Sequence, residues 1–319
     1  MRVLVAGATG VLGRAIVPLL ASAGHDVVGL ARSRPPDPPD GRVRFVAVDA
    51  LDGPAVAAAV RAAAPDAIVT MLTAIPPRID PRRMARQFRL TNRLRTEGTR
   101  HLIDAAAATG VRRFVAEGLA YGYDPRGAGL ADEDEPFWSD PPAQFAAPLR
   151  ALTELERRTG DAGGLVLRLG HLYGPGTGYA ADGDTVRLVR AGRLPLVGRG
   201  RSTFSFLHTA DAATAVLAAL GSDVTGALNI VDDEPALVAD WLPGLAHLLD
   251  APRPRRVPVA LARLAAGSWG AAFMTELRGA DNTRARQTLG WRPRYRSWRD
   301  GFPAELATPP SPTSSREKL

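Results

Sequence analysis

Three glycines near the start of the chain, Gly7, Gly10 and Gly13, have a spacing that suits the binding of phosphate groups. They follow an apolar run at 2–6 and precede an amphipathic stretch at 11–23, which predicts a strand that turns sharply into a helix. Glycine allows the tight turn, and the free amides at the helix start attract negative charge. A plain helix-capping turn is the alternative. We expect a dinucleotide in contact with Gly7, Thr9, Gly10, Val11, Leu12 and Gly13.

The residues after the second predicted strand bear on which dinucleotide binds. An acidic residue at this place normally takes the ribose hydroxyls of NAD, but here the strand ends at Ala31, followed by Arg32 and Ser33. A guanidinium and a hydroxyl suit a 2′-phosphate, because arginine pairs with two phosphate oxygens at once. The pattern favours NADPH over NADH, unless Arg32 only caps a loop.

Two further loops follow predicted strands and should lie along the same ligand. Asp49 and Ala50 come after the third strand, where a carboxylate can accept the adenine amino group. Asp49 could equally cap the helix that follows. Leu72 and Thr73 come after the fourth strand and are expected over the middle of the ligand, because ligands bind at the carboxyl ends of parallel strands.

The elements that must position these loops alternate regularly along the chain. Apolar runs of strand length recur, with alanine-rich helical stretches between most of them. This predicts an α/β fold of Rossmann type, with a doubly wound parallel sheet and a smaller C-terminal substrate lobe. The expected strands lie at 3–6, 27–30, 43–48, 67–72, 113–116 and 165–169, and the main helices at 11–23, 53–64, 83–109, 144–159, 236–249 and 259–266.

The same pattern predicts how the chain divides. We expect the dinucleotide-binding domain at 1–170, with later returns to the sheet near 202–232, and the substrate lobe mainly at 171–306. Residues 307–319 are rich in Pro, Ser and Thr and are expected to form a disordered tail.

Composition limits the kinds of partner. The chain has 319 residues and no cysteine, which excludes disulfides and thiolate sites, and its five histidines form no His-x-x-x-His pair, so no metal is expected. The net charge of +7 comes from arginines scattered along the chain, so we expect no nucleic-acid partner. No apolar run is long enough for a bilayer, and we expect no membrane partner and a cytoplasmic location. A small-molecule substrate is the expected partner, and the oligomeric state stays open.

Longer motifs give a family resemblance over residues 1–303. Beyond the glycine loop they are GT at 98–99, AYG at 120–122, LRLGHLYGPG at 167–176, FLHTAD at 206–211 and LGWRP at 289–293. With these motifs the chain resembles the extended short-chain dehydrogenase/reductase superfamily, which includes nucleotide-sugar epimerases and dehydratases. The resemblance implies a dinucleotide cofactor and a catalytic serine or threonine, tyrosine and lysine.

The chain departs from that catalytic set. The family's serine or threonine, about four residues before Tyr121, falls at Glu117. Counted from Glu154, its tyrosine and lysine fall at Ala146 and Arg150, and the only lysine of the chain is Lys318. In the family the tyrosine, with a pKa lowered by the lysine, protonates the alkoxide that hydride transfer to a ketone leaves. Arg150 could replace the lysine's hydrogen bonds to the nicotinamide ribose but not its proton transfer, because arginine stays charged. No residue is therefore assigned as catalytic.

Four residues are expected on the substrate side. Glu117, at a strand end, is either an acid with a raised pKa or the partner of an arginine. Tyr121, past the fifth strand, is either a donor in the cleft or a structural residue, as in the resembled family. His171 precedes a sharp turn and is expected to line the substrate side, together with Tyr173.

Three functions follow from these residues. The first, which we expect, is an NADPH-dependent ketoreductase acting on a polycyclic aromatic polyketide of the angucyclinone type in antibiotic biosynthesis. A phenol of the substrate would then supply the proton. The second is a redox-silent NADP(H) sensor resembling the NmrA-like regulators, which the loss of the catalytic residue types favours. The third is a nucleotide-sugar epimerase or dehydratase, which needs an enzyme base that the sequence does not securely offer.

Overall fold

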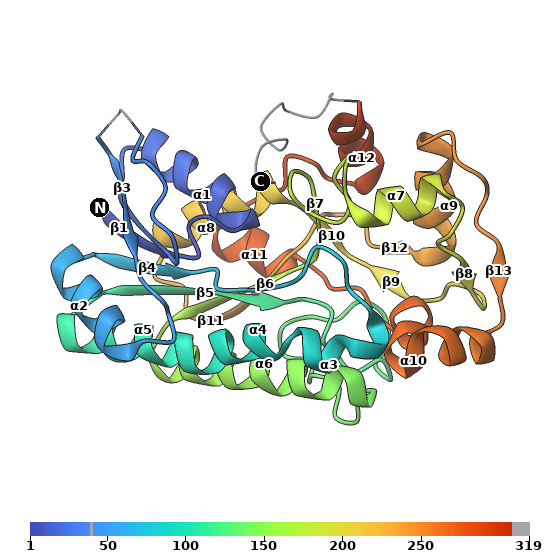
Figure 1. Cartoon of the computed structure of the whole chain (residues 1–319), viewed down its shortest axis with the longest axis horizontal. Coiled ribbons are helices and arrows are strands. Elements are labelled where there is room, and N and C mark those ends of the chain that lie inside the picture. Colours follow the sequence, from blue (N-terminus) through green and yellow to red (C-terminus); the bar gives the residue numbers. More distant parts are fainter. Residues whose placement is uncertain (39–40, 308–319) are drawn as a thin grey trace, which may run out of the picture.

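The computed structural model describes residues 1–38 and 41–307, and a seven-stranded sheet forms its centre (Figure 1). The strand order is β11-β6-β5-β4-β1-β2-β3, and every adjacent pair is parallel. The order reverses between β1 and β4, the point at which sheets of this kind bind dinucleotides. The predicted α/β fold of Rossmann type is confirmed. The strands are β1 (Arg2–Ala6), β2 (Asp26–Ala31), β3 (Val43–Ala47), β4 (Ala67–Thr70), β5 (Arg113–Leu119), β6 (Leu165–Leu169) and β11 (Gly226–Ile230).

Side chains of β1 alternate between two buried clusters, one on each face of the sheet. Val3 and Val5 lie in one cluster, and Leu4 and Ala6 lie in the other. Both faces are buried, as a parallel sheet requires. The first face is covered by α1 (Val11–Ser22) and α8 (Thr209–Leu220), and the second by α2 (Gly53–Ala63), α5 (Thr99–Thr109) and α6 (Ala143–Asp161).

The helix predicted at 83–109 is interrupted. The Thr99 amide reaches back to the Leu94 carbonyl, which makes one turn of π-helix where a regular α-helix was expected. Such turns are rare in proteins, and those that occur are often found at functional sites. The segment consists of η1 (Pro81–Arg83), α3 (Met84–Gln87), α4 (Arg89–Arg93), the π-helical turn η2 (Leu94–Gly98) and α5.

The C-terminal lobe has an aromatic core of its own, to the right in Figure 1. Phe204, Phe206, Trp241 and Phe302 are buried together in it. Its strands are β7 (His171–Tyr173), β8 (Leu196–Val197), β9 (Thr203–Phe204), β10 (Phe206–His208), β12 (Ala236–Leu237) and β13 (Arg256–Val257). Its helices are α7 (Asp184–Arg190), α9 (Val238–Leu248), α10 (Val259–Thr275, kinked at Gly267) and α12 (Trp298–Leu306), while α11 (Thr283–Thr288) packs on the sheet.

The expected returns to the sheet need a correction. Of the strands near 202–232, only β11 joins the main sheet, whereas β10 pairs with β7 and β9 pairs with β12. Gly170 lies between β6 and β7, and a Cβ there would overlap the Ser205 carbonyl, so the close approach of the chain before β10 requires glycine at this position. The part of the expected tail at 308–319 lies outside the described residues.

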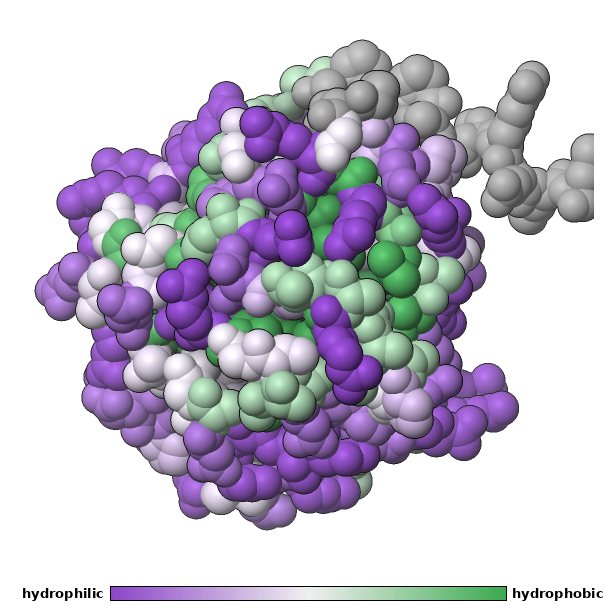
Figure 2. All heavy atoms as spheres, turned by 90° about the vertical axis from the view of Figure 1, so that its left-hand side faces the viewer, coloured by the Kyte–Doolittle hydropathy of each residue, from purple (hydrophilic) through white to green (hydrophobic). Residues whose placement is uncertain are grey.

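In the part of the chain that the structure describes, no helix is both long and apolar enough to cross a membrane. Figure 2 shows the end of the molecule that carries the N-terminus. Hydrophilic side chains surround a smaller apolar area on this face.

Candidate active site

The loop after β1 has the shape of a phosphate cradle. Gly7 has a φ of +87°, and a Cβ there would lie 2.5 Å from the Met71 carbonyl oxygen. A Cβ on Gly13 would overlap the Gly7 carbonyl. Among the described residues no side chain caps α1 at Gly10, so the first-turn amides remain available to an anion. This loop therefore fits the pyrophosphate of a dinucleotide.

The residues predicted at the adenosine end are exposed. Arg32 and Ser33 follow β2, and Asp49 follows β3. The Asp49 carboxylate accepts a hydrogen bond from the Leu51 amide at 2.9 Å, whereas Asp52 is the residue that caps α2. The alternative role of Asp49 as the helix cap was therefore wrong, since Asp52 occupies that position.

The loops after β3 and β4 pack against the long interrupted helix. A Cβ on Gly98 would lie 3.3 Å from Leu72 Cδ1 and 3.6 Å from the Ala50 Cβ. Thr73, next to Leu72, is exposed. The contact brings η2 to the two loops that are predicted to lie along the cofactor.

Sequence reasoning missed Arg95, which lies in η2. Its side chain is 2% exposed and interacts electrostatically with Glu117 and Tyr121. Burial lowers the pKa of Arg95, yet an arginine remains charged at neutral pH. The only signal in the sequence is its place three residues before the Gly98-Thr99 motif, and a single arginine among many gives no sign of burial.

Glu117 lies near the carboxyl end of β5, opposite Leu167 of β6. It is buried, and burial raises its pKa while the charge of Arg95 acts in the opposite direction. Glu117 thus combines the two properties considered for it, a raised pKa and an arginine neighbour.

Tyr121, His171 and Phe204 stack into an aromatic row. Ring centroids lie 4.3 Å apart for Tyr121 and His171, and 3.8 Å apart for His171 and Phe204. His171 Nδ1 lies 3.3 Å from the Ser205 carbonyl oxygen and must carry the proton in that contact. Burial lowers the pKa of His171 to about 3 and raises that of Tyr121 to about 12, so both rings are uncharged at neutral pH.

Tyr173 lies in the core of the lobe and not on this row. Its side chain is fully buried against Phe206 and Phe302, with ring centroids 6.2 and 4.9 Å away. A Cβ on Gly301 would overlap the Tyr173 hydroxyl, which shows how closely α12 covers it. The placement gives no support to the predicted substrate contact of Tyr173.

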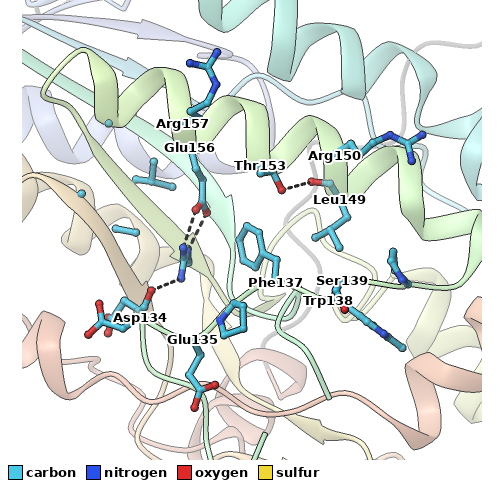
Figure 3. Close-up of a pocket in the computed structure, with 18 of the residues that line it drawn as sticks. Asp134, Glu135, Phe137, Trp138, Ser139, Leu149, Arg150, Thr153, Glu156 and Arg157 are labelled. Carbon is cyan, nitrogen blue, oxygen red and sulfur yellow. Dashed lines mark hydrogen bonds and ion pairs between the residues drawn. The ribbon is translucent and has the colours of Figure 1, made fainter. Parts of the chain in front are cut away.

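Arg150 lines a pocket that the cofactor loops do not share. It is exposed on α6 and lines a pocket of about 800 Å³ between this helix and the loop at 133–141 (Figure 3). Ala146 lines the same pocket, and no residue of the glycine loop does. In Figure 3 the Arg150 side chain points away from Phe137, on the other side of the pocket. This placement gives no support to the predicted contact of Arg150 with the nicotinamide ribose.

Two glutamates of α6 lie on different sides of the helix. Glu156 pairs with Arg168 of β6 at 2.8 Å, and both side chains are largely buried. Glu154, from which the family positions were counted, pairs instead with Arg157 on the outer side of the helix. In either register the helix brings no proton donor of the family type, because Ala143–Asp161 contains neither tyrosine nor lysine.

The residues described above form a phosphate cradle, a buried arginine with its glutamate neighbour, and an aromatic row. The turn η2, which carries Arg95, contacts the loops predicted to hold the cofactor, and the charge of Arg95 reaches Glu117 and Tyr121. Within residues 1–38 and 41–307, no three His, Asp or Glu side chains cluster as metal ligands. Such a site can hold a nicotinamide cofactor against a flat partner.

Comparison with known proteins decides the family. The model of the NAD dependent epimerase/dehydratase family matches residues 3–230, from β1 to the last residue of β11. The chain belongs to the NAD dependent epimerase/dehydratase family. Two solved structures similar to this family member share its fold. A dTDP-glucose 4,6-dehydratase from Streptomyces venezuelae with NAD bound has a TM-score of 0.76 at 21% identity and covers 96% of each chain. Human epimerase family protein SDR39U1 with NADPH has a TM-score of 0.73 at 22% identity, over 96% of this chain and 99% of that one.

One relative of this epimerase/dehydratase family member is much more similar in sequence. A Streptomyces sp. protein named 3-diazoavenalumate denitrifying reductase is 50% identical over 309 residues, which is 96% of this chain and 100% of that protein. With the family shown and a reductase as a relative of this similarity, the chain is an NAD(P)-dependent oxidoreductase.

Proposed function

We propose that this protein is an NADPH-dependent reductase that replaces the diazo group of an aromatic carboxylate with hydrogen and releases dinitrogen. The observation that carries the proposal is the composition of α6, which offers neither of the residue types that handle the proton in ketone reduction. A chain that is 50% identical carries the name of a reductase that removes nitrogen from a diazo compound. The two observations agree chemically.

Loss of dinitrogen removes the need for an acid on the protein. The nicotinamide, when bound, supplies a hydride. A carbon that bears a diazonium group, R–N2+, becomes R–H when it gains one hydride and loses N2, so atoms and charge balance without a proton. A ketone would instead become an alkoxide and require one.

The residues of this chain would then hold and orient the reactants. The glycine loop and the first turn of α1 would bind the pyrophosphate. Tyr121, the partly buried end of the aromatic row, would offer its ring to a flat substrate, because His171 and Phe204 are buried behind it. Because Tyr121 and His171 are uncharged at neutral pH, the row places no positive charge of its own against a diazonium cation. Aromatic faces attract such a cation.

We infer NADPH as the cofactor from the exposed Arg32 and Ser33 after β2, whose side chains suit a 2′-phosphate. A solved relative contains NADPH and another contains NAD, so the family accommodates either. A cytoplasmic location without nucleic-acid or membrane partners remains part of the proposal.

Reduction of a polycyclic aromatic polyketide ketone is the second candidate. The aromatic row would accept a polycyclic ring system, and a substrate phenol would have to supply the proton. A redox-silent sensor of NmrA type would bind NADPH and leave it intact. A nucleotide-sugar epimerase or dehydratase needs an enzyme base, and α6 offers no tyrosine for that role.

The test uses purified protein, NADPH and 3-diazo-4-hydroxybenzoate, with a panel of angucyclinone-type ketones in parallel. We expect NADPH oxidation with the diazo compound and formation of 4-hydroxybenzoate. Deuterium should pass to carbon 3 of the product from only one of the two NADPH isomers deuterated at nicotinamide C4, which separates the enzyme reaction from reduction in solution. NADH in place of NADPH tests the cofactor assignment.

The variant Tyr121→Phe tests whether the Tyr121 hydroxyl serves as the acid in the reaction, because it removes only that hydroxyl. If no protein acid is needed, kcat/KM should stay within about tenfold of the wild-type value. Oxidation of NADPH with a ketone and not with the diazo compound would replace the proposal with the ketoreductase. No oxidation with either would favour the sensor.

A further inference from the structure

Arg95 differs from the other buried arginines of the chain. Arg168 is 8% exposed and donates hydrogen bonds to Glu156, to a tyrosine hydroxyl and to a carbonyl. Arg278 is 7% exposed and donates to Glu135 and to several backbone carbonyls. Arg95 is 2% exposed, and neither its Nη1 nor its Nη2 has a hydrogen-bond partner among the described residues.

An unpaired guanidinium inside a protein is costly. Arginine cannot lose its charge, and a buried charged donor without an acceptor loses more free energy by desolvation than an ordinary polar group. Glu117 partly balances the charge of Arg95 through space, without a hydrogen bond between them in this structure. The unpaired guanidinium is therefore available to donate hydrogen bonds to an anionic oxygen.

The place of Arg95 points to the substrate. The turn η2, which carries Arg95, touches Leu72 and Ala50 through Gly98, in the predicted cofactor loops. The charge of Arg95 also reaches Tyr121, which begins the aromatic row. Arg95 thus belongs to a turn that contacts the predicted cofactor loops, and its charge reaches the first ring of the aromatic row, where we expect the polar group of a flat substrate.

We propose that the Arg95 guanidinium binds the carboxylate of the aromatic substrate and that Glu117 is the counter-charge which the carboxylate replaces. The fork of Nη1 and Nη2 matches the two oxygens of a carboxylate. This inference takes the substrate class, an aromatic carboxylate, from the proposed function. It does not depend on whether the enzyme removes a diazo group from that substrate. Arg95 is then a substrate-binding residue that selects acids over neutral analogues.

The test measures binding and needs no turnover. 4-Hydroxybenzoate and its methyl ester are titrated calorimetrically onto the protein with NADP+ present. We expect wild type to bind the acid at least tenfold more tightly than the ester. Arg95→Met should remove that preference, and Arg95→Lys should restore part of it. Arg89→Met, which changes an exposed arginine of α4, is the matched control and should bind both ligands as wild type does.

Several outcomes would overturn the inference. Equal affinity of the wild-type protein for acid and ester contradicts it without any variant, and so does acid binding that survives in Arg95→Met. NADP+ affinity should be the same in Arg95→Met and wild type, so a parallel loss of NADP+ binding would instead indicate a structural role. Reduction of a diazo carboxylate and its ester at equal rates would leave the proposed function intact but not this inference. If carboxylate binding depends on Arg95 but no diazo compound is reduced, the inference about Arg95 holds and the proposed reaction is wrong.

Discussion

His171 and His208 are both buried, and different hydrogen bonds hold them. His171 faces the Ser205 carbonyl, whereas His208 Nδ1 accepts a hydrogen bond from the Ala210 amide at 3.1 Å. Burial lowers the pKa of His171 to about 3 and that of His208 to about 4. Histidine in an unfolded chain titrates near pH ~6.5, so the unfolded protein binds more protons than the folded one between these values.

The contribution of these two histidines to the free energy of unfolding should therefore fall as the pH is lowered from about 6.5 to about 4. Each buried histidine contributes up to ~1.4 kcal/mol per pH unit in that window. His171→Phe keeps a ring in the aromatic row and removes the titrating group, so its stability should fall less steeply with decreasing pH. Urea unfolding between pH 4.5 and 7.5 measures this, with the exposed His247→Phe as the control. Identical slopes for wild type and His171→Phe would contradict the neutral, buried assignment.

At the scale of elements, most of the features that could be predicted came from short-range sequence patterns. The glycine loop, the strands and the loops after them follow from neighbouring residues, because turn chemistry and strand alternation are local. The orientation of α6 does not follow from its neighbouring residues. Glu154 and Glu156 stand two residues apart and point to different sides of the helix, and only Arg168, on a strand that follows the helix, shows which glutamate is inward.

The burial of Arg95 was unpredictable for a related reason. A π-helical turn shifts the faces of a helix relative to a regular α-helical pattern, and helical periodicity assumes the regular one. The neighbours of Arg95 also come from β5 and its following loop, some twenty residues further along the chain. Contacts of this range are absent from any local window.

Two glycines with the same φ allow the role of the glycine loop in cofactor binding to be tested separately from backbone strain. Gly7 and Gly24 both have a φ of +87°, but a Cβ on Gly24 meets nothing within 4 Å, whereas one on Gly7 meets the Met71 carbonyl oxygen at 2.5 Å. Gly24→Ala should cost about 1–2 kcal/mol of stability through its left-handed backbone and leave NADPH binding unchanged. Gly7→Ala should be less stable than Gly24→Ala and bind NADPH at least about tenfold more weakly. Thermal unfolding and fluorescence titration measure both, and equal behaviour of the two variants would refute the cradle.

At the scale of the whole molecule, sheet and lobe are interleaved along the chain. The expected boundary at residue 170 marks where the lobe begins but not where the sheet ends. β6 pairs with β11, and α1 packs against α8, yet β7, α7 and β10 lie between these partners in the sequence. Sheet and lobe therefore cannot be separated by one cut.

A fragment of residues 1–170 should consequently fail to fold cooperatively. Without β11 the edge of β6 would be unpaired, and without α8 the buried side chains Ile16 and Leu20 of α1 would lose part of their cover. We expect aggregation, or a broad thermal transition by circular dichroism, with the full chain as the control. A sharp, reversible transition in the fragment would show that the sheet is complete without its last strand.

The late arrival of β11 has a consequence for how the protein is made. Ribosomes add about 5–20 residues per second, so roughly 10–50 seconds separate the emergence of the glycine loop from that of the final strand. During that interval the nascent chain carries a finished phosphate loop on an unfinished sheet, with apolar surface open to chaperones. Capture of the cofactor therefore belongs to the end of biogenesis, although the residues that receive its phosphates are among the first to be synthesised.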